Sequence, residues 1–192
     1  MYKQLRSVVL GCVKCARRKA VQHHSAGQLQ YQLFLRPGRR VSMDIWGGDL
    51  PKSKTGATSL VTLIDSFTRW PEAYPVGSHT ALIVADCLFE YICRHGLMTE
   101  LLTDCGPEFT SKVFKHLCTR MGITKLFTTG WHPRTNGSIE RFHRPLGCSL
   151  HILTQANPSN WDEFVPPVLF ALRTSVIDSI GFSPFELEHG RK

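Results

Sequence analysis

The sequence predicts an α/β domain built around a mixed β-sheet. Three short segments rich in β-branched and apolar residues come first along the chain, with polar turns between them. Segments with apolar residues at helical spacing then alternate with further short strands, and the chain ends in helical segments. Strands joined by short turns pair antiparallel, whereas strands joined through helices run parallel. The sequence therefore predicts a sheet with both kinds of pairing, flanked by helices.

The three early strands are expected at residues 40–46, 59–65 and 70–76. The second is almost entirely apolar (SLVTLID), which is typical of a buried strand. The third contains Pro71 and Pro75, which have no backbone N–H to donate, so we expect it at an edge of the sheet.

The later elements follow from helix start and stop signals. Thr80 can cap a helix that continues to Gly96, a residue type that commonly ends helices. The remaining expected elements are a strand at 100–104, a helix at about 108–121, a strand at 123–128, a helix from about Ser138, a helix at 160–174 and a short helix after Ser183. The 160–174 helix contains Pro166 and Pro167, which disfavour a helix interior.

Charge is distributed unevenly along the 192 residues. The net charge is +8, yet residues 1–40 contain nine of the 23 Lys and Arg residues and none of the 15 Asp and Glu residues. Such a basic block commonly contacts a polyanion, most simply nucleic acid, and the alternative is a solvated basic tail. Because Pro37 and Gly38 interrupt regular structure, we expect a basic arm at 1–36 and a core domain at 37–192.

The composition argues against a membrane protein and against a disulfide-stabilised one. No apolar run approaches the roughly 18–20 residues of a membrane span, so we expect no membrane partner. The seven cysteines are odd in number and irregularly spaced, which indicates reduced thiols in an intracellular protein.

Three acidic residues occupy positions that suit a metal site. Asp44 lies in the first expected strand, Asp104 ends the fourth, and Glu140 lies near the start of a helix, so they can converge at one end of the sheet. An acid within an apolar strand is costly to bury unless it is paired or binds a cation, and Mg²⁺ prefers carboxylate oxygens. Alternatives remain open, because Asp104 before Gly106 also fits a turn, and Glu140 with Arg144 also fits a surface ion pair.

Five longer blocks of the sequence carry a family resemblance. They are VSMDIWGGDLPKSKTG, VTLIDSFTRWPEAYPV, TDCGPEFTS, TTGWHPRTNGSIERFHR and WDEFVPPVLFALRTSVIDSIGFSPFEL, and 35 residues separate Asp104 from Glu140. From about residue 5 to its end the chain resembles the integrases of retroviruses and, more closely, of gypsy-type LTR retrotransposons, whose D,D-35-E pattern has this spacing. The resemblance implies an RNase H-like fold with a five-stranded mixed sheet. It also implies catalytic and metal-binding roles for Asp44, Asp104 and Glu140.

The resemblance further implies a reaction and its partners. Water or a DNA 3′-hydroxyl attacks a phosphodiester at a site that holds Mg²⁺ or Mn²⁺, with two ions expected. Attack by water trims the ends of the element's DNA, and attack by the exposed 3′-hydroxyls joins them to target DNA. Because two DNA ends are joined in concert, a homo-oligomer (a dimer or tetramer) is expected to act on DNA in the nucleus.

Four residues near the third carboxylate are candidates for DNA contact. His132 and Asn136 belong to a loop that resembles the family's HPQ-x-[DN]-G pattern and would position DNA, although Asn136 equally suits a helix cap. Arg141 and Arg144 would contact phosphate groups, and the alternative is a solvated helix face.

Four residues with conspicuous side chains are expected to be structural. Asp65, in LIDSFTRW, corresponds by resemblance to a structural family position. Trp46, Trp70 and Trp161 are expected in the core rather than stacked on DNA bases.

Cys12 and Cys15 have the spacing of half a zinc site. Integrases of this family carry a finger in which two His precede two Cys. Here no His lies upstream of Cys12, and His23 and His24 follow as adjacent residues. We therefore expect a truncated zinc finger, with two ordinary thiols and no Zn²⁺ bound by this chain.

Two residues depart from the family pattern in the helix that begins near Glu140. Pro145 and Gly147 cost about 3 and about 1 kcal/mol relative to Ala in a helix interior. We therefore expect this helix to kink or end early, and a DNA contact that relatives make with a basic residue to be missing at Gly147. The small basic domain that often follows the core is not expected after Lys192.

Three functions are compatible with these observations. The favoured one is a metal-dependent integrase that performs 3′-end processing and DNA strand transfer. The second is a catalytically decayed or host-adopted DNA- or protein-binding module, which the departures favour and the intact carboxylates disfavour. The third is an RNase H-like nuclease that only hydrolyses, which the family blocks at 131–144 and 160–187 disfavour.

Overall fold

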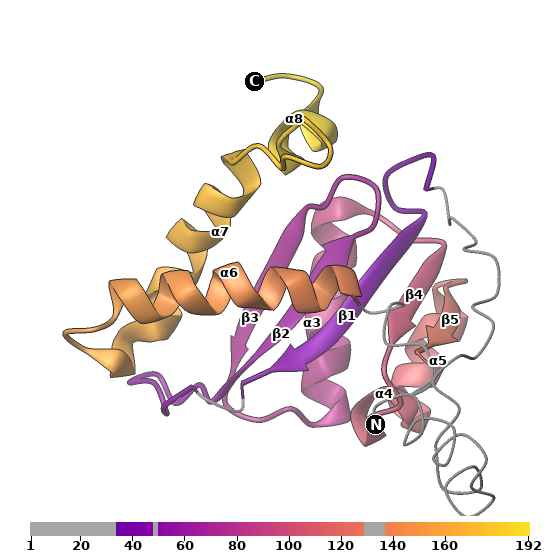
Figure 1. Ribbon diagram of the computed structural model, residues 1–192. Coiled ribbons are helices and arrows are strands. Elements are labelled where there is room, and N and C mark those ends of the chain that lie inside the picture. Colours follow the sequence, from indigo (N-terminus) through magenta and orange to yellow (C-terminus); the bar gives the residue numbers. More distant parts are fainter. Residues whose placement is uncertain (1–33, 48–49, 129–136) are drawn as a thin grey trace, which may run out of the picture. The chain divides into compact units, whose positions relative to one another are not determined.

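A computed structural model describes residues 34–47, 50–128 and 137–192, and its centre is one five-stranded sheet (Figure 1). The strands are β1 (Arg40–Trp46), β2 (Ser59–Asp65), β3 (Pro71–Val76), β4 (Glu100–Thr103) and β5 (Thr124–Phe127). Their order is β3-β2-β1-β4-β5, in which β1, β2 and β3 pair antiparallel while β4 and β5 run parallel to β1. The predicted mixed sheet is confirmed, and so is the edge position of the proline-containing strand.

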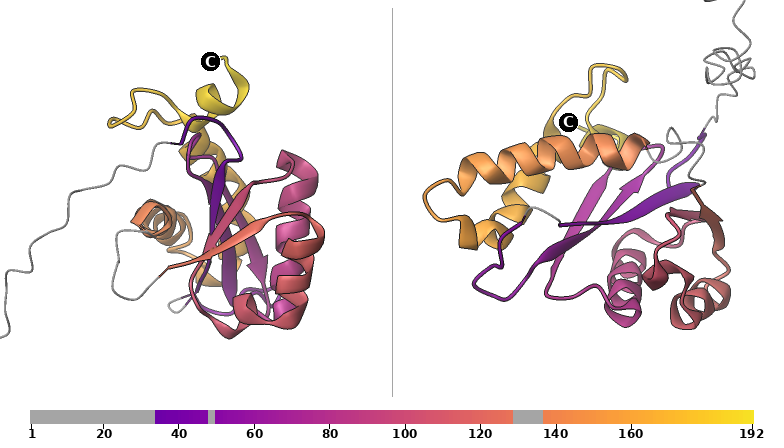
Figure 2. Two further views of the ribbon diagram at one scale, coloured as in Figure 1. Left: turned by 90° about the vertical axis from the view of Figure 1, so that its right-hand side faces the viewer. Right: turned by 60° about the horizontal axis from the view of Figure 1, so that its bottom comes forward.

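Helices cover both faces of this sheet (Figure 2). They are α3 (Ala81–His95), α4 (Pro107–Thr110), α5 (Lys112–Arg120), α6 (Gly137–Leu153), the 3-10 helix η2 (Pro158–Phe164), α7 (Val165–Thr174) and α8 (Pro184–His189). α3 and α5 lie on one face, and α6 crosses the other. Within the described ranges, none of the helices combines the length and apolar character needed to span a bilayer, and the five cysteines there are free thiols.

Alternation along the strands divides the interior into two cores. Successive side chains of a strand point to opposite faces. Val61 of β2 packs with α3, α4 and α5, whereas its neighbour Leu60 packs with α6 and α7. On β1 the same alternation directs Met43 into the first core and Asp44 to the face that α6 covers. Asp44 is therefore turned toward the helix that carries Glu140.

The helix expected at 108–121 is two helices, because Ser111 interrupts it. Its backbone is extended (φ −60°, ψ 154°), and its hydroxyl accepts a hydrogen bond of 3.2 Å from the Phe114 backbone N–H. Ser111 is thus the N-cap of α5 and the end of α4. Thr80 precedes α3 as predicted, but its side chain makes no capping hydrogen bond.

The helix expected at 160–174 is also divided. Residues Pro158–Phe164 form η2, and α7 begins only at Val165. Pro166 and Pro167 consequently lie in the first turn of α7, where a backbone N–H has no partner within the helix and its loss costs little.

The early end expected for α6 is wrong, since the helix continues to Leu153 through Pro145 and Gly147. A stripe of side chains, including Ile139 and Leu146, is fully buried in the second core, and such packing sustains a helix against poor local propensity. Gly147 lies against the Trp46 indole, where an added Cβ would be only 3.0 Å from two ring carbons. Gly147, where relatives carry a basic residue, thus allows α6 to pack closely against Trp46.

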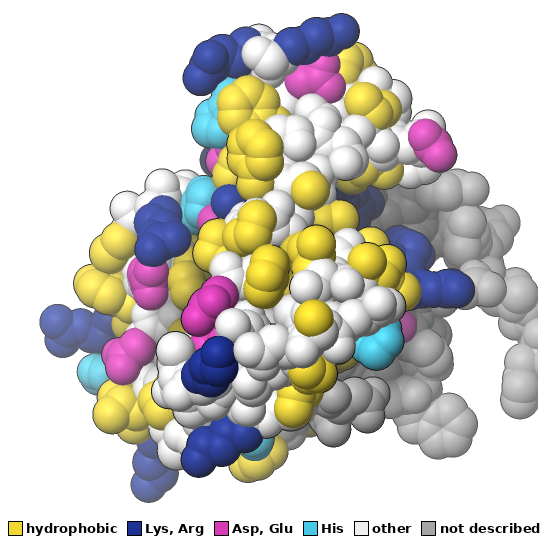
Figure 3. Space-filling view, turned by 90° about the vertical axis from the view of Figure 1, so that its left-hand side faces the viewer, with side chains coloured by type: hydrophobic (Ala, Val, Ile, Leu, Met, Phe, Trp, Pro, Cys, Tyr) yellow, Lys and Arg dark blue, Asp and Glu magenta, His cyan; other side chains and the backbone are white. Residues whose placement is uncertain are grey.

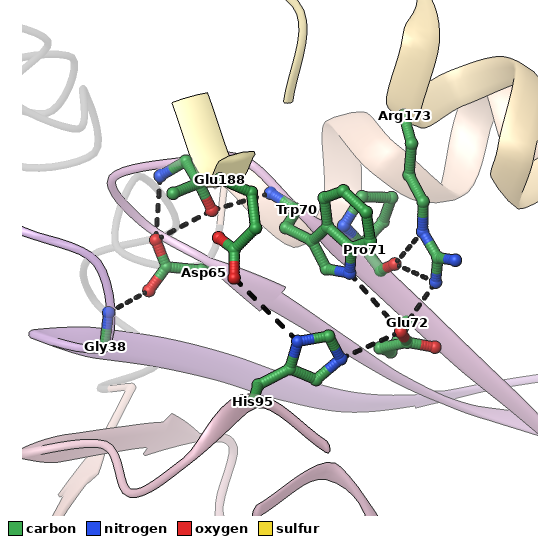
Figure 4. Close-up of polar contacts among 9 residues, drawn as sticks. Gly38, Asp65, Trp70, Pro71, Glu72, His95, Arg173 and Glu188 are labelled. Carbon is green, nitrogen blue, oxygen red and sulfur yellow. Dashed lines mark hydrogen bonds and ion pairs between the residues drawn. The ribbon is translucent and has the colours of Figure 1, made fainter. Parts of the chain in front are cut away.

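The structural roles expected for Asp65 and the tryptophans are consistent with their contacts. Asp65 is 3% exposed, and its carboxylate accepts hydrogen bonds from the backbone N–H groups of Gly38 and Thr68 at 2.9 and 2.7 Å (Figure 4). Trp70 and Trp161 are buried, whereas Trp46 is only partly buried and packs against the second core.

A buried polar network ties α3, α7 and α8 to β3 (Figure 4). Oε1 of Glu72 accepts a hydrogen bond from His95 Nε2 at 3.0 Å and lies 2.7 Å from an Nη atom of Arg173. Nδ1 of His95 faces Glu188 on α8, at 3.9 Å. Although burial alone would lower it, hydrogen bonds to Glu188 and Glu72 raise the pKa of His95 to about 9.

Replacing His95 by Gln is expected to flatten the pH dependence of stability. Because the pKa of His95 is raised from its ordinary 6.5 to about 9, its contribution is complete below pH 6.5 and is lost as the pH rises through 9. Between pH 6.5 and 10, the free energy of unfolding should fall by about 1–2 kcal/mol more in the wild type than in His95→Gln. Urea denaturation at each pH measures this, and parallel curves would contradict a charged His95.

Candidate active site

Asp44 and Asp104 lie near the carboxyl ends of β1 and β4, and these ends are side by side because the two strands are parallel neighbours. Asp104 directly follows β4, and both carboxylates line a pocket of about 440 Å³. The rest of the lining is Ile45, Gly47, Ser59, His79, Glu108 and Phe109. The structure thus brings two of the three predicted carboxylates into one pocket.

Asp44 is in an unfavourable place for a negative charge. Burial raises the pKa of its carboxyl to about 6, the charges of Asp104 and Glu140 act in the same direction, and a hydrogen bond from the Ile45 N–H at 2.9 Å opposes them. The charge of Glu140 therefore contributes to the raised pKa of Asp44, although Glu140 does not line the pocket. A cation bound between these groups would relieve both the repulsion and the cost of burial.

Asp104 also has the turn role that its sequence context allowed. Its Oδ1 accepts a hydrogen bond of 3.0 Å from the Gly106 N–H, at the start of α4. A Cβ at Gly106 would lie 3.1 Å from the same oxygen, so glycine permits this close approach. One carboxylate oxygen thus shapes the turn, while the carboxylate as a whole lines the pocket.

Glu140 is exposed in the first turn of α6. Negative charge is stabilised there by the helix dipole. The alternative of a surface ion pair with Arg144 is not realised within the described part of the chain. The described residues also contain no ready-made group of three metal-ligating side chains, so the protein offers a carboxylate pair with a third carboxylate nearby.

His143, one turn after Glu140, is a residue of the site that the sequence did not single out. Its Nε2 is 2.8 Å from Thr62 Oγ1, and its Nδ1 is 4.0 Å from a carboxylate oxygen of Asp44. Burial lowers the pKa of His143 to about 4, so the ring is neutral at pH 7. The signal available in the sequence was its spacing, because residues three apart share a helix face.

His79 and Glu108 were also missed. They line the pocket beside the two aspartates, and His79 Nε2 lies 3.6 Å from Glu108 Oε1. His79 belongs to the connection between β3 and α3, where no periodic pattern indicates its direction. Glu108 belongs to the single-turn helix α4, which is too short to show a helical pattern by itself. The pocket therefore holds a third acidic side chain that the spacing of the triad did not reveal.

The other predicted site residues are not brought into the pocket. Arg141 and Arg144 are exposed on α6. The remaining candidates lie outside the described residues: His132, Asn136, Cys12 and Cys15.

Comparison with known proteins identifies relatives of the chain. Residues 35–133 match the family model of the integrase core domain, a range that includes Asp44 and Asp104. The chain is 31% identical over 145 residues to the retrovirus-related Pol polyprotein from transposon 412 of Drosophila melanogaster, covering 75% of this chain and 12% of that protein. It is also 31% identical over 191 residues to the Gag-Pol polyprotein of feline leukemia virus, covering 97% of this chain and 11% of that protein. The chain thus spans about a tenth of the length of these relatives.

Solved structures show the same fold. The HTLV-2 integrase catalytic core domain in complex with magnesium superimposes with a TM-score of 0.67 at 20% identity, over 81% of this chain and 99% of that one. A chain of the simian T-cell lymphotropic virus intasome gives a TM-score of 0.78 at 22% identity, over 98% of this chain and 67% of that one. The sheet and its flanking helices are therefore the RNase H-like fold of integrase catalytic cores. Because the family model covers half of the chain and the fold agrees, the chain belongs to the integrase core domain family.

Proposed function

We propose that the chain is a DNA integrase, a polynucleotidyl transferase whose catalytic residues are Asp44, Asp104 and Glu140. The observation that carries this proposal is the pocket formed by Asp44 and Asp104 on parallel neighbouring strands, with the charge of Glu140 acting on Asp44. Membership of the integrase core domain family supports the same chemistry, namely 3′-end processing and strand transfer.

The same three carboxylates would hold Mg²⁺ or Mn²⁺, with two ions as the expected number. The residues fit such ions, because Mg²⁺ is usually held by one or two protein carboxylates together with substrate phosphate rather than by a complete protein cage. A partly buried Asp44 beside two further carboxylates also favours a bound cation. When bound, the ions would polarise the phosphodiester and offset the charge that develops on it.

The substrate would be DNA, both the ends of the element and the target. Exposed Arg141 and Arg144 lie on α6 after Glu140 and can meet phosphate groups, and His132 and Asn136 are proposed to position DNA beside them. The basic arm at 1–36 would add sequence-independent attraction to the DNA backbone. It precedes the proposed catalytic core at 37–192 in the sequence. The nucleus is the proposed place of action. The solved intasome chain supports a DNA-bound assembly.

A homo-oligomer is the proposed working form, since the HTLV-2 core has been solved in dimeric and trimeric forms. The described surface offers a mostly apolar groove between α3 and α5, lined by Leu82, Ala85, Asp86, Phe89, Val113, His116, Leu117, Arg120 and Met121. Phe89, one of the lining residues, is 49% exposed, and the groove carries opposite charges in Asp86 and Arg120. In a two-fold dimer the acidic side chain of each copy can meet the basic side chain of the other.

Phe89→Asp is expected to weaken self-association, because a charge would be buried in the apolar contact. Analytical ultracentrifugation should give a dissociation constant raised about tenfold or more. A matched control is Phe170→Asp on α7, because Phe170 is 67% exposed and does not line the groove. The face drawn in Figure 3 carries several exposed hydrophobic side chains, so exposure alone does not mark a contact surface. If both variants associate like the wild type, the groove is not the contact.

The test of the proposed function is DNA nicking and strand transfer by the purified chain with Mg²⁺, with Mn²⁺ and with excess chelator. Metal-dependent joining of DNA ends to a target would support the integrase. Metal-dependent hydrolysis without joining would indicate a nuclease. DNA and metal binding without cleavage would indicate a catalytically decayed or host-adopted binding module.

A further inference from the structure

His143 connects α6 to β1 and β2 beside Asp44. Its Nε2 lies 2.8 Å from Thr62 Oγ1, and Thr62 Oγ1 donates a hydrogen bond of 3.1 Å to the backbone carbonyl oxygen of Asp44. The His143 ring is stacked on the Trp46 indole, with 5.7 Å between ring centroids and 20° between planes. The His143 side chain is only 11% exposed. One ring on α6 thus contacts two strand residues, Thr62 and Trp46, beside the proposed catalytic aspartate.

The hydrogen bonds determine which ring nitrogen carries the proton. The Thr62 hydroxyl has one proton, and the carbonyl oxygen of Asp44 can only accept. Thr62 Oγ1 must therefore accept from His143, so the proton is on Nε2. Nδ1 then carries a lone pair and lies 4.0 Å from Asp44 Oδ2. The ring is oriented as a link between helix and sheet, with its unprotonated nitrogen toward the carboxylate.

Glu140 is carried by the first turn of α6. It is exposed, so its position relative to Asp44 is inherited from α6. The apolar stripe of α6 holds the helix against the second core, but apolar contact is non-directional and allows a helix to slide or rotate. A hydrogen bond has a narrow range of distance and angle. Within the described part of the chain, His143 supplies the polar side-chain contacts between α6 and strands β1 and β2.

We propose that His143 is a positioning residue, which through Thr62 and Trp46 sets the distance between Glu140 and Asp44. The proposal rests on the proposed function, in that it concerns the carboxylates of that site. Partners of this kind, which orient a metal ligand without touching substrate, commonly change metal affinity or activity by 10–100-fold when they are removed.

The test compares three variants with a matched control. His143→Leu keeps an apolar side chain against Trp46 but cannot donate to Thr62. His143→Gln restores a donor near the Nε2 position, and Thr62→Val removes the hydroxyl from the other side of the link. The control is His151→Leu, an exposed histidine on the same helix.

We expect kcat for metal-dependent nicking to fall about 10–100-fold in His143→Leu and in Thr62→Val, with the KM for DNA unchanged. His143→Gln should recover most of kcat, and His151→Leu should match the wild type. Calorimetric titration should show Mn²⁺ affinity falling in the same two variants. If His143→Gln is as impaired as His143→Leu, or if KM rather than kcat changes, the positioning role is refuted.

Crystal structures separate this proposal from the proposed function. The carboxylates of Asp44 and Glu140 should move apart or sideways by about 1 Å in His143→Leu and stay in place in His143→Gln, a displacement large enough to affect catalysis. An unchanged separation in His143→Leu would overturn the proposal even in an active enzyme. A wild type without any nicking would refute the integrase, while the same structures would still decide whether His143 positions the helix.

Discussion

Glu140→Gln is expected to abolish metal-dependent nicking and strand transfer while leaving the fold intact. The substitution keeps the size of the side chain and removes its negative charge. Because Glu140 is exposed in the first turn of α6, its loss should change the free energy of unfolding by less than about 0.5 kcal/mol. Loss of a charged ligand should lower kcat at least as much as loss of one transition-state hydrogen-bond donor, by about a thousandfold.

The control for this comparison is the same substitution at an exposed glutamate outside the proposed site. Glu163→Gln, an exposed glutamate on η2, should retain wild-type nicking and strand transfer. Activity of Glu140→Gln equal to that of the wild type would mean that the site is wrong or that the preparation is contaminated. If the wild type binds DNA and metal but does not cleave, the binding-module hypothesis gains support instead.

Glu72→Ala is expected to be the most destabilising of these substitutions, with a loss of about 3–5 kcal/mol in the free energy of unfolding. Glu72 is 5% exposed, and its Oε1 accepts from His95 at 3.0 Å and lies 2.7 Å from Arg173. Although burial would raise it, the hydrogen bond from His95 and the charge of Arg173 hold the pKa of Glu72 below its ordinary value. Without Glu72, the largely buried His95 and Arg173 lose the carboxylate that they share. Removing one partner of a buried ion pair is strongly destabilising because it leaves buried charge uncompensated.

Glu90→Ala provides the matched control for this prediction. Glu90 pairs with Arg94 one turn along α3, but the two side chains are 47% and 57% exposed. An exposed helical pair of this kind contributes only about 0.3–0.5 kcal/mol. Urea denaturation of both variants measures the difference. A Glu72→Ala loss no larger than that of Glu90→Ala would show that the network of Figure 4 adds little to stability.

Local patterns in the sequence were sufficient for most of the fold. Short segments rich in β-branched and apolar residues predicted the strands at 40–46 and 59–65, and the prolines of 70–76 predicted an edge strand. These signals work because side-chain direction repeats with the backbone geometry of each element. Family resemblance, rather than spacing alone, singled out the three carboxylates. The parallel pairing of β1 with β4 then explains physically why Asp44 and Asp104 share a pocket.

The helix predictions failed where packing outweighed local preference. Pro145 and Gly147 argued for an early end of α6, yet the buried stripe and the close contact with Trp46 carry the helix to Leu153. At Ser111 the reverse occurred, because a single capping side chain ended α4 inside an apparently continuous helical pattern.

The sequence by itself determined the family, the mixed sheet and the positions of the three carboxylates along the chain. The tertiary structure alone decided that His143 meets Thr62, 81 positions away in the chain, and that Arg173 meets Pro71, 102 positions away. The physical reason is that element type and side-chain direction are local properties of the backbone. Which polar groups become partners depends instead on how distant elements pack, and no short-range pattern in the chain encodes that.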